Sequence, residues 1–138
     1  VEQQANELGK YLHQQDIKLD LYFVSSAVRT QQTARHALKH CNWFQKEKLV
    51  VADELLEIHM GDWVGLERVT AYSNEVLEEI KKDPWKFSPP NGESQKQVEE
   101  RMSSYIANVI LAKADTLSKE SNEEIKIGIF GHCLAFSC

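Results

Sequence analysis

Three short apolar segments, separated by stretches with helical periodicity, constrain what this chain can fold into. The strand candidates are residues 17–24, 49–51 and 125–130. Apolar residues recur at spacings of three and four in the helix candidates, which are residues 5–12, 33–41, 66–80 and 98–110. Strands that alternate with helices in this way imply a mainly parallel sheet covered by helices on both faces. We therefore expect a three-layer α/β/α fold.

Residues that begin or break helices refine these boundaries. Ser25 and Ser26 are good N-cap residues for the second helix, and Asp83-Pro84 ends the third. The stretch 87–92, Phe-Ser-Pro-Pro-Asn-Gly, is a loop, and residues 118–124 form a polar connection. Ser94 to Gln97 has the form of a capping box that starts the long fourth helix.

Composition and charge limit the partners of this chain. Its 138 residues, 42% of them hydrophobic, fit one globular domain with a real core. The net charge is −5 and Lys and Arg form no run longer than a pair, so we expect neither a nucleic-acid nor a membrane partner. An anion would have to bind in a local pocket where a few cationic groups and backbone amides converge.

The cysteines indicate a reducing compartment. The chain has three, at positions 41, 133 and 138, without a CxxC pair, which argues against a disulfide framework or a zinc site. We expect a cytoplasmic protein on this ground. No apolar run approaches the length that spans a bilayer.

Two polar side chains follow strand candidates at their carboxyl ends, where open parallel sheets bind ligands. Arg29 lies in the first turn of the helix after residues 17–24, and helix amides and the helix dipole would join it in favouring a phosphate. His132 follows the apolar run 127–130. Each has an ordinary alternative: a solvated arginine at a helix start, and a packed or capping histidine.

Glu57 is a third candidate, because it lies among apolar residues just past the strand candidate 49–51. Burial favours the protonated carboxyl, which could give its proton to a leaving group. The alternative is a surface carboxylate in a turn.

Taken together and in order, these segments resemble the histidine phosphatase superfamily, also called the phosphoglycerate mutase-like family. Residues 25–34, SSAVRTQQTA, resemble its S-S-x-x-R-[AT]-x-Q-T-A signature, and residues 57–66, EIHMGDWVGL, resemble its E-x-x-x-G-x-W-E-G-L segment. Residues 90–94, PNGES, with Val98 and Arg101 resemble its P-x-G-E-S-x-x-x-V-x-x-R segment. Gly131-His132 resembles the strand-end G-H-G of its second catalytic histidine, and residues 4–12 resemble the helix after its first loop.

The resemblance implies a phosphoglycerate mutase-like fold and phosphoryl transfer through a phosphohistidine. Arg29 and His132 would then bind and stabilise the phosphoryl oxygens, and Glu57 would protonate the leaving alcohol. Ser25 would help to seat the pocket. The implied substrate is a small phosphorylated metabolite, hydrolysed or used as a phosphoryl donor. No metal or organic cofactor is implied, and the i,i+4 pair His36 and His40 lacks a third metal ligand.

The departures from the family pattern matter as much as the matches. The family's nucleophile lies in an R-H-G motif at the end of the first strand, and no R-H-G occurs in these 138 residues. Cys133 replaces the usual Gly after the histidine, and Val64 the usual Glu after Trp63. We expect one partial domain over residues 1–138, without the family's first strand and its C-terminal elements, and inactive by itself.

Three interpretations remain open. The chain could be a fragment of a phosphatase or mutase, a non-catalytic phosphate-binding or interaction domain of the same family, or an unrelated α/β domain. The family's strand order would leave the strand that carries His132 at the sheet edge, so we also expect self-association through that edge. Substrate selectivity is expected from the loop 84–92 and from parts outside the chain.

Overall fold

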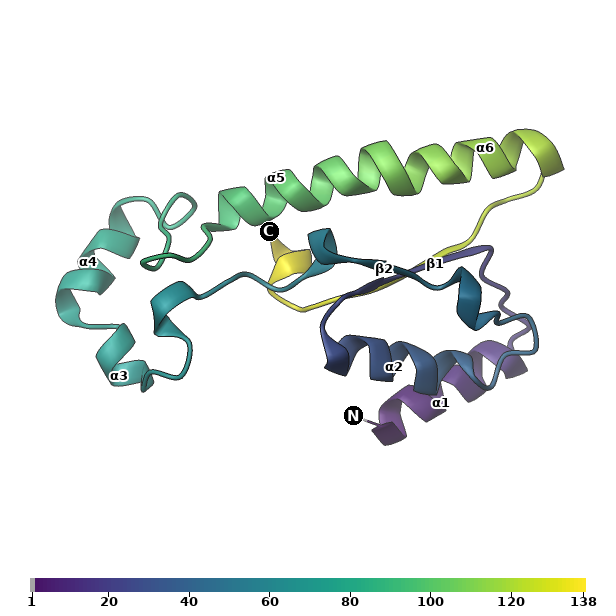
Figure 1. Cartoon of the computed structure of the whole chain (residues 1–138), viewed down its shortest axis with the longest axis horizontal. Coiled ribbons are helices and arrows are strands. Elements are labelled where there is room, and N and C mark those ends of the chain that lie inside the picture. The colour runs from purple at the N-terminus through teal and green to yellow at the C-terminus, as the bar shows by residue number, and fades with distance from the viewer. Residues whose placement is uncertain (1) are drawn as a thin grey trace.

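The computed structural model describes residues 2–138, and a parallel three-stranded sheet forms its middle layer (Figure 1). The strands are β1 (Leu21–Ser25), β2 (Val50–Ala52) and β3 (Ile127–Phe130), in the order β2-β1-β3. One face is covered by α1 (Glu2–Gln14) and α2 (Val28–Leu38). The opposite face is covered by one long helix made of α5 (Gln95–Tyr105), a π-helical turn (Ile106–Ile110) and α6 (Leu111–Ser121). The expected three-layer α/β/α arrangement is therefore confirmed.

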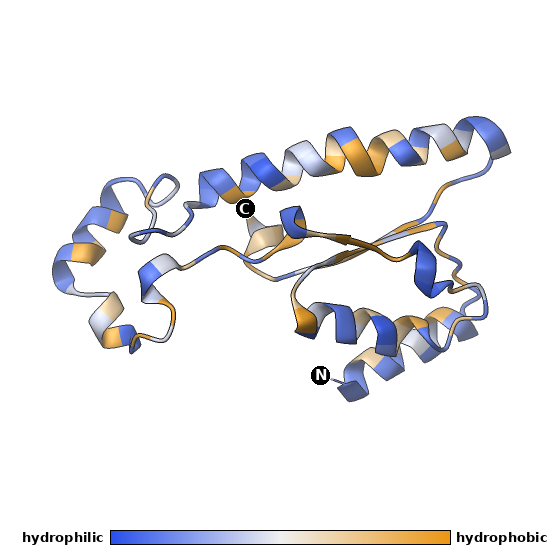
Figure 2. Cartoon of the chain, viewed as in Figure 1, coloured by the Kyte–Doolittle hydropathy of each residue, from blue (hydrophilic) through white to orange (hydrophobic). Residues whose placement is uncertain are grey.

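Alternation along β1 builds a core on each face of the sheet. Phe23 is fully buried in a cluster with Val98, Met102 and Ile110 of the long helix. The neighbouring Tyr22 points to the other face, where its ring packs against Phe44 at a centroid distance of 5.4 Å. Figure 2 shows the hydrophobic strands between helices whose outer surfaces are hydrophilic. Because successive strand residues face opposite ways, one strand serves both cores.

The packing of α1 against α2 is unusually close at Gly9. A Cβ atom at Gly9 would lie 1.9 Å from the backbone oxygen of Ala37 and 2.9 Å from the His40 ring. Ala5, Ala34 and Ala37 are also buried. Small residues on both helices therefore let the two backbones approach closely.

The segment predicted as one helix over residues 66–80 is instead two, and this prediction was wrong. It forms α3 (Arg68–Ala71) and α4 (Asn74–Lys82), separated at Ser73, whose side chain accepts the Val76 N–H and caps α4. With the loop that follows, α3 and α4 make an arm that extends from the body of the molecule in Figure 1. The Trp63 ring packs against the Tyr72 ring at 5.0 Å and anchors the arm.

Several element boundaries also differ from the prediction. The first strand begins only at Leu21, α6 continues to Ser121 and ends at Asn122 in the left-handed conformation, and β3 begins at Ile127. The capping box of Ser94 and Gln97 is confirmed. Short 3₁₀ turns lie at Lys46–Lys48, Asp53–Leu55, Gly61–Trp63 and Ala135–Ser137. Over residues 2–138, no helix combines the length and the apolar content needed to cross a bilayer.

Candidate functional site

The candidate site lies where β1 and β3 end side by side. Val24 of β1 is level with Phe130 of β3, so the next residues of both strands leave the sheet at the same edge. Ser25 closes β1, and His132 follows β3 after one further residue. Residues more than 100 positions apart in sequence thereby meet at the carboxyl edge of the sheet, where open α/β sheets place their ligand sites.

His132 is the centre of a buried hydrogen-bond network. Its Nε2 lies 2.9 Å from Ser25 Oγ and 3.3 Å from Thr30 Oγ1, and its Nδ1 lies 3.1 Å from Arg29 Nη2. A guanidinium can only donate, so His132 Nδ1 accepts from Arg29 and the ring proton of the neutral imidazole is on Nε2. That proton is within reach of the Ser25 and Thr30 hydroxyl oxygens.

The surroundings of His132 favour its neutral form. Burial lowers the pKa of the imidazole, the Arg29 guanidinium lowers it further, and Glu57 opposes this in part. His132 is 8% exposed, so water reaches it poorly. An anion that arrives between Arg29 and His132 would reverse this balance, because a negative charge stabilises the imidazolium.

The start of α2 positions Arg29 and Thr30, although not through the predicted caps. The N-cap is Ala27 and makes no side-chain cap hydrogen bond, so the expectation that a serine caps this helix was wrong. Ser25 Oγ instead accepts the Ala27 N–H at 3.3 Å and also meets His132. Thr30 was not singled out from the sequence; its place next to Arg29 in the SSAVRT stretch was the available signal.

Glu57 is half-buried, and its carboxylate accepts hydrogen bonds from backbone N–H groups of the C-terminal turn. Glu57 Oε1 accepts the Ala135 N–H at 2.8 Å and the Ile58 N–H at 3.0 Å, and Oε2 accepts the Leu134 N–H at 3.3 Å. Arg29 and Glu57 also line the same surface hollow. The structure thus brings Arg29, Glu57 and His132 together from three separate segments.

A second pair, Glu93 and Arg101, fastens the segment that carries Glu57. Arg101 Nε and Nη2 donate to the two Glu93 carboxylate oxygens at 2.8 and 3.0 Å. The remaining donors reach the backbone oxygens of Glu54 at 2.7 Å and Glu57 at 3.2 Å. Glu93 also accepts the His59 N–H at 3.0 Å, and the hydrogen bond from Arg101 holds the pKa of Glu93 below its usual range. We call Glu93 and Arg101 the clamp.

The hollow beside Arg29 and Glu57 has a volume of about 440 Å³. Its lining comes mostly from residues 53–64 together with the clamp, and no residue of 84–92 belongs to it. The loop 84–92 instead contacts the segment that lines the hollow, where Pro90 O accepts the Asp62 N–H at 2.9 Å. Gly61 has a φ of +54°, and a Cβ there would lie 2.1 Å from Pro90 O, so the close approach requires glycine.

The other histidines and cysteines lie elsewhere or have different contacts. His36 lies 3.5 Å from the Glu2 carboxylate, and His40 bonds to Asn6. Cys133 is exposed while His132 is buried, so the two do not pair. Among residues 2–138, no three side chains of His, Cys, Asp or Glu gather as at a metal site.

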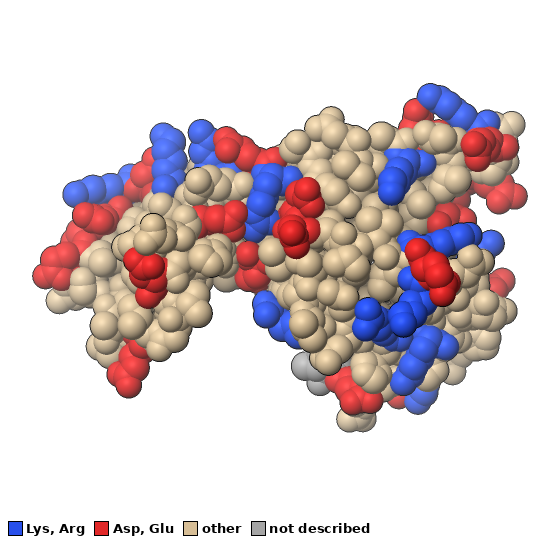
Figure 3. Space-filling model, viewed as in Figure 1, with Lys and Arg blue, Asp and Glu red and all other residues tan. Residues whose placement is uncertain are grey.

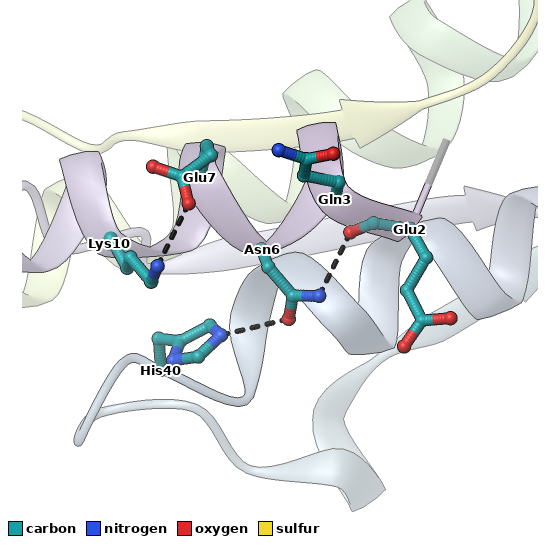
Figure 4. Close-up of a pocket in the computed structure, with 6 residues that line it drawn as sticks. All are labelled: Glu2, Gln3, Asn6, Glu7, Lys10 and His40. Atoms are coloured by element: carbon teal, nitrogen blue, oxygen red, sulfur yellow. Dashed lines mark hydrogen bonds and ion pairs between the residues drawn. The ribbon is translucent and has the colours of Figure 1, made fainter.

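A separate hollow of about 460 Å³ lies between α1 and the end of α2, far from His132 in sequence and on other elements (Figure 4). Its polar groups mostly satisfy one another. Asn6 donates to Glu2 O at 2.9 Å, Lys10 pairs with Glu7 at 2.8 Å, and His40 lies 3.0 Å from Asn6. It presents no convergent set of groups for a ligand.

Fold and site together define an α/β protein with a histidine and an arginine gathered at the carboxyl edge of a parallel sheet. The sequence profile of the histidine phosphatase superfamily (branch 1) matches residues 2–136. The chain belongs to this superfamily, and the resemblance seen in its motifs is confirmed.

Two curated relatives support this assignment. The chain is 29% identical over 104 residues to the 2,3-bisphosphoglycerate-dependent phosphoglycerate mutase of Bartonella tribocorum, covering 74% of this chain and 50% of the relative. It is also 29% identical over 105 residues to a phosphoglycerate mutase of Schizosaccharomyces pombe, covering 75% and 49%. The chain therefore spans about half the length of the curated relatives it matches.

Solved structures show the same fold. A mycobacterial glucosyl-3-phosphoglycerate phosphatase superposes with a TM-score of 0.75 at 20% identity, over 99% of this chain and 62% of the other. A putative alpha-ribazole-5'-P phosphatase from Escherichia coli gives a TM-score of 0.65 at 24% identity, over 96% and 60%. The phosphoglycerate mutase-like α/β fold is confirmed by these likenesses.

Proposed function

We propose that this chain carries the phosphate-binding half of a phosphomonoester hydrolase or phosphoryl transferase that acts on a small phosphorylated metabolite. The observation that carries the proposal is the contact between Arg29 Nη2 and His132 Nδ1 at 3.1 Å, next to Ser25 and Thr30. Two nitrogen groups meet there at a strand edge. Such a cradle suits the equatorial oxygens of a phosphoryl group.

The proposed roles follow from the positions of the side chains. Arg29 binds phosphoryl oxygens through its planar guanidinium. His132 takes up a proton from solvent when the phosphate arrives, and the imidazolium donates a hydrogen bond to a phosphoryl oxygen. Ser25 keeps the ring of His132 oriented. Glu57 lines the same hollow as Arg29 and is the proposed proton donor to the leaving alcohol. In that role its carboxylate first takes up a proton from solvent and releases the Leu134 and Ala135 N–H groups that it binds here.

Residues 1–138 are proposed as one partial domain that lacks the nucleophile of a phosphohistidine mechanism. The printed sequence contains no R-H-G, and among its five histidines only His132 lies in the phosphate cradle. We expect no turnover of p-nitrophenyl phosphate by this chain. Activity that disappears in His132→Ala would contradict the proposal that the chain lacks its nucleophile.

The coding region before Val1 separates the two remaining interpretations. An in-frame R-H-G there would favour the enzyme, and its absence would favour a non-catalytic phosphate-binding domain.

Binding of inorganic phosphate tests the cradle directly, by calorimetry or by NMR of the imidazole signals. Arg29→Met should weaken binding at least about tenfold, which corresponds to 1.4 kcal/mol. Arg35→Met is the matched control, because Arg35 lies on the same helix and donates only to Gln31. Phosphate binding should also raise the pKa of His132. Equal affinities in the two variants would argue against the proposal.

We also propose self-association through β3 and a cytoplasmic location. Among the described residues, β3 pairs on one side only, with β1, so its outer backbone groups are available to a second chain. Light scattering that shows a stable monomer at micromolar concentration would count against this.

The proposed cytoplasmic location is supported by three cysteines that are all free thiols.

A further inference from the structure

The hollow beside the phosphate cradle has a wall of apolar side chains. Leu56, Ile58, Met60 and Val64 line it, all from the segment that carries Glu57. Val64 is 70% exposed, which is high for a valine and leaves its methyl groups open to a ligand. A phosphate held by Arg29 would direct its ester oxygen and alcohol portion along this wall, since Arg29 and Glu57 border the same hollow.

The charged residues of the same hollow do not favour a second anionic group. Its lining contains two guanidinium groups, Arg29 and Arg101, and three carboxylates, Asp53, Glu57 and Glu93. Arg101 directs its donors to Glu93 and to the backbone oxygens of Glu54 and Glu57.

His59 and Arg29 are engaged as well. His59 Nδ1 accepts the Gly61 N–H at 3.2 Å, and its backbone N–H donates to Glu93. Arg29 is directed at His132 and would be occupied by the phosphate itself. A carboxylate or second phosphate on the substrate would therefore lie beside the apolar wall and Asp53 without a cation of its own.

We infer that the site selects phosphate monoesters whose alcohol portion is uncharged and partly apolar, and discriminates against substrates that carry a second anionic group, such as phosphoglycerate. This inference rests on the proposed function and narrows its substrate class. The apolar wall binds the alcohol by burial of surface, whereas a second anionic group would lose water there without gaining an ion pair.

A matched pair of ligands tests the inference on the full chain. Phenyl phosphate and para-carboxyphenyl phosphate differ by one carboxylate, and inorganic phosphate is the reference ligand. Calorimetry should show phenyl phosphate binding at least about tenfold more tightly than para-carboxyphenyl phosphate. Phenyl phosphate should also bind more tightly than inorganic phosphate. Equal or tighter binding of the carboxylated ester would overturn the inference.

A variant of the wall provides a second measurement. Val64→Arg should improve binding of para-carboxyphenyl phosphate several-fold, whereas Val64→Gln, which is long but neutral, should not. No difference between these two variants would also overturn the inference. If inorganic phosphate binds in an Arg29-dependent manner while the esters show no preference, only the substrate class is wrong; if none of the three ligands binds, the proposed function fails with it.

Discussion

Removing the Arg101 side chain should show how strongly the clamp holds the Glu57 segment. Arg101→Met keeps the length of the apolar stem but deletes four hydrogen bonds, two of them to the Glu93 carboxylate. The side chains of Arg101 and Glu93 are 21% and 26% exposed, so the pair is neither fully buried nor on the open surface. The expected cost lies between those of these two environments.

The magnitude follows from that intermediate exposure. Removing one partner of a fully buried pair costs about 3–5 kcal/mol, whereas an exposed pair contributes about 0–1 kcal/mol. Glu93 keeps the hydrogen bond from the His59 N–H after the substitution, which limits the penalty. We expect Arg101→Met to lower the free energy of unfolding by about 2–3 kcal/mol, measured by urea denaturation.

Lys96→Met is the matched control on the same helix. Lys96 pairs with Glu100 at 3.6 Å, and these side chains are 48% and 62% exposed. We expect that change to cost less than about 0.5 kcal/mol. A loss in Arg101→Met no larger than in the Lys96 control would refute the view that the clamp stabilises the site.

The effect of Arg101→Met should depend on pH in a defined direction. The pKa of Glu93 is lowered in the folded state by the hydrogen bond from Arg101, so its contribution to stability is present above the unfolded-state pKa near 4.5. That contribution is lost as the pH falls through the folded-state pKa. The difference between the wild type and Arg101→Met should therefore shrink in acid. A difference that stays constant down to pH values where Glu93 is protonated would contradict this assignment.

Two further predictions concern α1 and the cradle. Gly9→Ala should destabilise by about 1–3 kcal/mol in urea denaturation, although alanine normally favours a helix, because the new methyl would overlap Ala37 O; exposed Lys10→Ala should be nearly neutral. The His132 imidazole should titrate below 6.5 in NMR. The imidazole has the higher pKa in the unfolded state and is therefore protonated there first as the pH falls. The contribution of neutral His132 to stability is complete above pH 6.5 and is lost as the pH falls toward the folded-state pKa. Arg29→Met should raise the pKa of His132 but leave it below 6.5, since burial remains; a midpoint at or above 6.5 in the wild type would show that the ring is not buried as described.

The sequence by itself determined the layers and the candidate residues. Apolar periodicity separates strands from helices locally, so the α/β class and the capping box at Ser94 were predictable without tertiary information. The same periodicity places Arg29 and His132 just after strands. Because the carboxyl ends of parallel strands share one edge of the sheet, their common location was predictable as well. The break at Ser73 was missed because Val69, Tyr72 and Val76 keep helical spacing through it, and only the capping bond at Ser73 ends the pattern.

Only the tertiary structure decided which side chains meet. Arg29, Thr30 and Ser25 contact His132 across more than 100 residues, and no local pattern specifies such a distance or the proton on Nε2 that follows from it. The clamp likewise joins Arg101 to the backbone of residues 54 and 57, which depends on how α5 packs over the segment after β2. Local periodicity is a property of neighbouring residues, whereas the cradle, the clamp and the apolar wall are properties of elements brought together by packing.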